Sequence, residues 1–150
     1  MFDTLFDSQR SRALLALAAA AALAGGVSTA QAEMVKLHAN MNATQEVPPT
    51  TSKGSGTGEF TYDTATKKLS YTLTYKDMTG PVTAGHIHGP AAAGANAGVE
   101  VPFQNAGTSP VKGEATLTDA QAADLMGGKT YVNLHTADNK GGEIRGQITK

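Results

Sequence analysis

Apolar and polar residues alternate along most of the chain after residue 32. In residues 34–41, Val35, Leu37, Ala39 and Met41 occupy every second position. Successive side chains of a β-strand point to opposite faces, so this period of two predicts a strand with one face in a core. The pattern recurs, and further strands are expected over 56–62, 69–76, 99–103, 111–117, 129–136 and 142–148, with one more that starts at Pro81.

One segment departs from this pattern. Residues 119–126, DAQAADLM, read as a short helix that Thr118 or Asp119 caps and Gly127-Gly128 ends. About seven or eight short strands with a single helix predict an all-β fold, an antiparallel β-sandwich.

The N-terminal residues have the features of a secretory signal peptide. Arg10 and Arg12 precede an apolar run over residues 14–27, and Ala30-Gln31-Ala32 follows. That order predicts cleavage after Ala32, which leaves residues 33–150 as one periplasmic or secreted domain. A buried N-terminal helix is the alternative interpretation.

Charge and composition exclude several classes of function. The formal net charge is −1, which provides no basic surface for nucleic acid. No later segment approaches the roughly 20 apolar residues of a membrane-spanning helix, so we expect no membrane insertion. Cysteine is absent, so disulfides and thiolate metal sites are excluded.

The last two predicted strands form a hairpin centred near Asn139. Residues whose numbers sum to about 278 then face each other, so His135 lies opposite Glu143. Alternation places a polar row on one face: Tyr131, Asn133, His135, Glu143, Arg145 and Gln147. The other face carries the expected core residues: Val132, Leu134, Ile144 and Ile148.

All four histidines fall on the face that points away from the core. Ile87 should point inward, so His86 and His88 point outward together, with bases about 6 to 7 Å apart. His135 comes from a neighbouring strand, and His38 faces the same way. Clustered imidazoles in a chain without cysteine suit copper, which the stability order favours, or zinc.

Two further features complete this prediction. Glu143 is placed beside His135 and is expected to accept a hydrogen bond that orients its ring. The Gly/Ala-rich stretch after His88 is expected to form a mobile rim around the site. The alternative is that the histidines simply face water, because an H-x-H pair alone is a weak signal.

Two long segments resemble a known family. "GPVTAGHIHGPAAAGANAGVEVPF" (80–103) and "LTDAQAADLMGGKTYVNLHTADNKGGEIRGQI" (117–148) are similar to the CHRD domain, first described in chordin. The opening "LHANMNATQEVPPTTSKGSGTGEFTYD" also fits the family. The resemblance implies an immunoglobulin-like β-sandwich and, from chordin, an extracellular binding role. The H-x-H strand is also similar to that of copper-zinc superoxide dismutase, a β-sandwich enzyme, by analogy only.

Three functions fit these residues. The first is an exported copper-binding protein that uses His86, His88 and His135, with His38 as a weaker fourth candidate. The second is a metal-free extracellular module that binds another exported protein. The third is a small copper redox enzyme with an open coordination position. A full dismutase site is excluded, because four histidines are too few for its two metals.

Overall fold

The computed structural model describes residues 31–150 of the protein. The predicted signal peptide, residues 1–32, therefore lies almost wholly outside the described residues. Within the described part, no helix has the length and apolar character needed to span a membrane.

Eight strands and one α-helix make up the described chain. The strands are β1 (Met34–Asn42), β2 (Ser55–Asp63), β3 (Lys68–Lys76), β4 (Val82–His88), β5 (Val99–Pro102), β6 (Val111–Thr116), β7 (Tyr131–Thr136) and β8 (Ile144–Gln147). The helices are α1 (Asp119–Met126) and a single 3-10 turn, η1 (Ala43–Gln45). This composition confirms the all-β class with one short helix.

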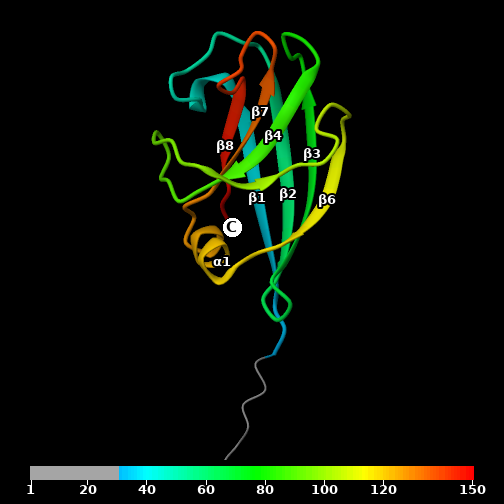
Figure 1. Ribbon diagram of the computed structural model, residues 1–150, viewed down its shortest axis with the longest axis vertical. Coiled ribbons are helices and arrows are strands. Elements are labelled where there is room, and N and C mark those ends of the chain that lie inside the picture. The colour runs from blue at the N-terminus through cyan, green and yellow to red at the C-terminus, as the bar shows by residue number, and fades with distance from the viewer. Residues whose placement is uncertain (1–30) are drawn as a thin grey trace, which may run out of the picture.

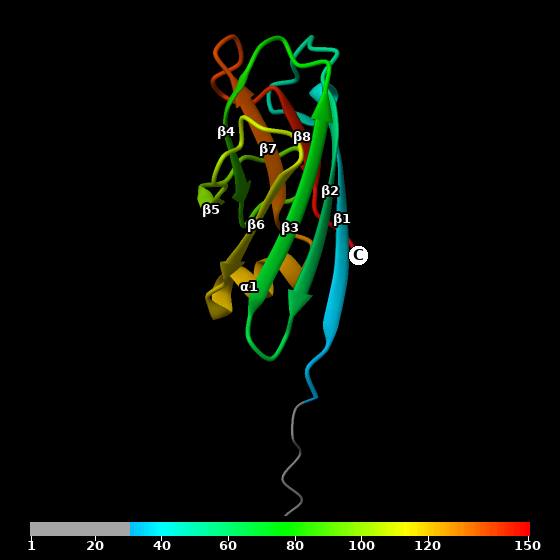
Figure 2. The same ribbon diagram turned by 90° about the vertical axis from the view of Figure 1, so that its right-hand side faces the viewer.

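All paired strands are antiparallel and form one continuous sheet in the order β5-β4-β7-β8-β1-β2-β3-β6. The sheet folds over on itself, so that β1, β2 and β3 face β4 and β7 across the interior (Figures 1 and 2). The two halves join where β8 meets β1, through the pair Asn42 and Arg145. The expected sandwich is therefore a single sheet that is nearly closed.

The core fills the space between these two halves. In β1 the buried and exposed residues alternate along the whole strand, as the period of two predicted. The four residues assigned to the core face of the last hairpin, Val132, Leu134, Ile144 and Ile148, are all 0 % exposed. Because apolar burial is the main favourable term in folding, these positions fix which face of β7 and β8 turns inward.

The helix and the last hairpin both follow the predicted local pattern. Thr118 caps α1, and a capping box pairs its side chain with Gln121. Tyr131 lies opposite Gln147 and Asn133 opposite Arg145, which is the register that a hairpin centred on Asn139 requires. This register places the polar row of β7 and β8 on the face away from the core.

Candidate metal centre

Three of the four histidines converge on adjacent strands. His86 and His88 lie on β4, and β7 pairs with β4 so that His135 is diagonal to His86. The ring centroids are 5.4 Å apart for His86 and His88, 4.9 Å for His86 and His135, and 6.5 Å for His88 and His135. One nitrogen of each ring lies within 4.8 Å of the others, which is close enough for three imidazoles to bind one ion.

Backbone carbonyls orient two of these rings. His88 Nδ1 donates to the carbonyl of Ala97 at 3.0 Å, and His135 Nδ1 donates to the carbonyl of Lys140 at 2.9 Å. A proton held on Nδ1 leaves Nε2 with the lone pair that a metal needs, and metal-binding histidines are commonly oriented in this way. His88 Nε2 is buried and has no hydrogen-bond partner among the described residues.

The surroundings of His86 and His135 favour the neutral form of these two rings. Burial lowers the pKa of His86, and the neighbouring His135 and His88 lower it further. Burial also lowers the pKa of His135, against the opposing effect of the Lys140 carbonyl. A neutral imidazole is the form that binds metal, so these shifts favour a ligating state at neutral pH.

The polar face that carries the histidines is covered, which corrects the expectation of a mobile rim. Residues 89–98 pack over it, and Arg145 holds them by donating to the carbonyl of Ala95 at 2.7 Å and to Asn96 Oδ1 at 3.2 Å. The Arg145 guanidinium lies 3.4 Å from the ring centre of Tyr131, which stacks on His88 at 4.9 Å. His88 is therefore fixed between β7 and this loop.

Glu143 does not orient His135, so that prediction is wrong. Its carboxylate accepts hydrogen bonds from Ser52, Thr79, Thr136 and Asn139. The residue precedes β8, so strand alternation does not govern where its side chain points. Lys140 supplies the orienting carbonyl for His135 instead.

His38 lies apart from the other histidines. It is exposed on β1, pairs with Glu59 of β2, and bridges to Thr149 near the C-terminus. It does not belong to the group of three that shares one possible ion.

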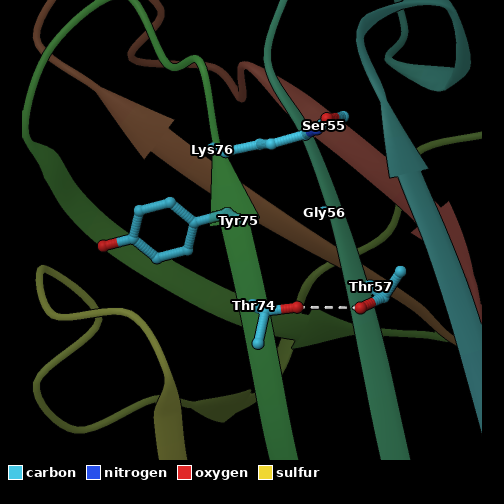
Figure 3. Close-up of a pocket in the computed structure, with 6 residues that line it drawn as sticks. All are labelled: Ser55, Gly56, Thr57, Thr74, Tyr75 and Lys76. Atoms are coloured by element: carbon cyan, nitrogen blue, oxygen red, sulfur yellow. Dashed lines mark hydrogen bonds between the residues drawn. The ribbon is translucent and has the colours of Figure 1, made fainter.

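An open surface pocket of about 240 Å³ lies on the opposite half of the sheet, over the start of β2 and the end of β3. Its lining residues are Ser55, Gly56, Thr57, Thr74, Tyr75 and Lys76 (Figure 3). The lining contains no histidine or carboxylate, so this pocket supplies none of the ligands considered above.

Two buried polar residues near the histidines, Asn133 and Glu46, were not predicted from the sequence as part of the site. Asn133 is directly opposite His86 in the β4–β7 ladder, and Glu46 lies in the loop after η1. Alternation had already placed Asn133 on the histidine face, so that signal was present in the sequence. Glu46 has no such signal, because only long-range packing brings it to this region.

The fold and this cluster define an all-β module with a histidine triad on a covered polar face. The family model for the CHRD domain matches residues 37–148, and the chain belongs to this family. The family is typically extracellular. No curated protein and no solved structure shows significant similarity to the chain.

Proposed function

We propose that this protein is an exported metal-binding protein that holds copper, with zinc as the second candidate, through His86, His88 and His135. The observation that carries the proposal is the convergence of three ring nitrogens within 4.8 Å of one another. The carbonyl contacts at His88 and His135 support it, because they leave Nε2 available to an ion.

The donor set supports copper or zinc over other common ions. Imidazole nitrogens suit both metals, whereas calcium and magnesium require oxygen ligands. Copper is the first candidate and zinc the second, because divalent copper binds a given nitrogen site more tightly than zinc does. The proposed activity is metal binding alone, and it does not include a copper-dependent reaction.

Export is part of the proposal. The order of basic residues, apolar run and Ala30-Gln31-Ala32 supports a cleaved signal peptide. The typically extracellular character of the CHRD family agrees with it.

Alanine substitution of the triad tests the site. His86→Ala, His88→Ala and His135→Ala should each weaken Cu(II) binding by more than about tenfold, because each removes one of three imidazole ligands. Isothermal titration of untagged protein measures the affinity. His38→Ala is the matched control and should bind as the parent does, since His38 lies outside the cluster.

Equal copper affinity in the parent and all three triad variants would contradict the proposal. A parent protein that takes up neither copper nor zinc would also do so. The module that binds another exported protein would then be the better explanation of this chain.

A further inference from the structure

Asn133 contributes a fourth polar atom to the histidine cluster. Its side chain is 3 % exposed, and its Oδ1 lies 3.0 Å from His135 Nε2. The same His135 nitrogen lies 3.1 Å from His86 Nδ1. One amide oxygen and two imidazole nitrogens therefore crowd together on the covered face of β4 and β7.

A proton on His86 Nδ1 can be donated to His135 Nε2, but it leaves the amide oxygen of Asn133 facing that nitrogen without a shared partner. His135 Nδ1 donates to the Lys140 carbonyl, so Nε2 of the neutral ring is an acceptor. It faces Asn133 Oδ1, which is also an acceptor. Asn133 is buried and His135 is half-buried, and two acceptors in contact repel each other unless a shared partner satisfies both.

A metal ion matches the spacing of these atoms. Ligand atoms that bind one metal at about 2.0 to 2.2 Å are separated from each other by roughly 2.8 to 3.6 Å in square or tetrahedral geometry. The separations of 3.0 and 3.1 Å at His135 Nε2 fall in that range, whereas the three ring nitrogens as a set lie within 4.8 Å of one another and would draw closer around an ion.

Glu46 determines which end of the Asn133 amide faces the histidines. Glu46 Oε1 and Asn133 Nδ2 both lie close to the Cα atom of Gly142. A Cβ atom added to this glycine would overlap Glu46 Oε1 and would lie only 2.7 Å from Asn133 Nδ2, so the carboxylate and the amide nitrogen are neighbours. Gly142 has a φ of +132°, a conformation that glycine tolerates, and its lack of a side chain permits this approach.

The attraction between these two groups fixes the amide. The Glu46 side chain is buried, and burial raises the pKa of its carboxyl above the ordinary value despite the opposing effects of Arg145 and the Asn133 amide, the two polar groups that face it. Oε1 accepts no hydrogen bond from the described residues, so the contact is an electrostatic attraction and not a well-formed hydrogen bond. A flipped amide would turn its oxygen toward the carboxylate, which is unfavourable.

We propose that Asn133 Oδ1 is a fourth metal ligand beside His86, His88 and His135, and that Glu46 is the positioning residue that keeps this oxygen turned toward the ion. This inference rests on the proposed function. Three imidazoles with one amide oxygen favour divalent copper or zinc over monovalent copper, which soft sulfur ligands select.

The test is titration of Cu(II) and Zn(II) into the parent and three variants of the full exported chain. Asn133→Ala removes the oxygen and should weaken Cu(II) binding by about tenfold or more. Glu46→Gln keeps the shape of the side chain but removes the charge that fixes the amide, and it should weaken binding by about tenfold. Glu59→Gln changes the net charge equally at an exposed position and should have no effect.

Two readouts separate positioning from general destabilisation. The double variant Asn133→Ala/Glu46→Gln should bind as Asn133→Ala does, because Glu46 acts through the amide. The Cu(II) electron paramagnetic resonance spectrum should change in both single variants and stay unchanged in Glu59→Gln. If Asn133→Ala does not fold, Glu46→Gln decides the question.

The outcomes distinguish this inference from the proposed function. If the parent binds Cu(II) and both Asn133→Ala and Glu46→Gln bind equally well, the fourth ligand is wrong and the triad stands. If Asn133→Ala alters only the titration of His135 and not metal affinity, the amide is a proton acceptor and the inference is overturned. A parent that binds neither metal overturns both.

Discussion

At the scale of single residues, Glu143 is a buried carboxylate that several hydrogen bonds stabilise in its charged form. Burial raises the pKa of this carboxyl, but hydrogen bonds from Ser52, Thr136 and Thr79 outweigh burial and lower it to about 2. The side chain is 0 % exposed, so water screens these hydrogen bonds little. Glu143 thereby ties the loop before β2, the segment before β4 and the end of β7 to the start of β8.

Glu143→Gln should therefore destabilise the fold. At neutral pH the free energy of unfolding should fall by about 3 kcal/mol, because an amide cannot accept the same set of hydrogen bonds. Denaturant unfolding of the two proteins measures the difference. Glu59→Gln, at an exposed position on β2, is the control and should change stability by less than about 0.5 kcal/mol.

The same substitution predicts a pH dependence. The pKa of Glu143 falls from 4.5 in the unfolded chain to about 2 in the folded protein, so its contribution is complete above pH 4.5 and is lost as the pH falls toward 2. The stability gap between parent and Glu143→Gln should narrow over that range. A gap that stays constant from pH 7 to pH 2 would show that the charge of Glu143 does not stabilise the fold.

At the scale of elements, hydrogen bonds from β7 and β8 hold the loop over residues 89–98 against the polar face of the sheet. Arg145 holds Ala95 and Asn96, and Gln147 Nε2 donates to the carbonyl of Ala91 at 2.9 Å. Tyr131 also contacts this loop, since its hydroxyl accepts from Ala97 N at 3.2 Å. The side chains of β7 and β8 thus supply the contacts that a Gly/Ala-rich segment cannot make through its own side chains.

Asn96→Ala should loosen this loop. The substitution removes the bond from Arg145 and the bond from Asn96 Nδ2 to the Val47 carbonyl at 3.0 Å. Amide hydrogen exchange over residues 89–98 should rise, while the core strands keep their protection, because Asn96 is exposed. Asn40→Ala, at an exposed position on β1, is the matched control. Unchanged exchange in the loop would mean that the Asn96 contacts do not hold it.

At the scale of the whole molecule, the described fold begins where the predicted cleavage ends. Glu33 N donates to Thr64 Oγ1 at 3.0 Å, and Thr64 N donates to the Glu33 carbonyl at 3.0 Å. These bonds tie Glu33 to the turn between β2 and β3. The residue after Ala32 is therefore already hydrogen-bonded to the folded domain, one residue before β1 begins.

The exported protein should accordingly begin at Glu33. Mass spectrometry of protein recovered from the periplasmic or secreted fraction measures this N-terminus, and the chain that starts there should show the β-rich circular dichroism of the full fold. Recovery of a chain that still begins at Met1 would contradict the signal-peptide prediction.

The sequence by itself determined the strands, the helix and the register of the last hairpin. These features depend on interactions between near neighbours: a period of two decides which face is buried, and a turn centred near Asn139 sets which residues pair. The same local rule placed His86, His88, Asn133 and His135 on one face. Local alternation is therefore sufficient to predict most of the candidate site.

Only the tertiary structure decided how that face is covered and which groups orient the rings. Alternation predicts side-chain direction only within a strand, and Glu143 precedes β8. Its side chain therefore does not point to the predicted face but contacts a cluster of hydroxyl groups. Glu46 and the loop over 89–98 reach the histidines through long-range packing. Such contacts form when the sheet folds over on itself, and no periodicity of the chain encodes them, because distant segments meet only once the core has closed.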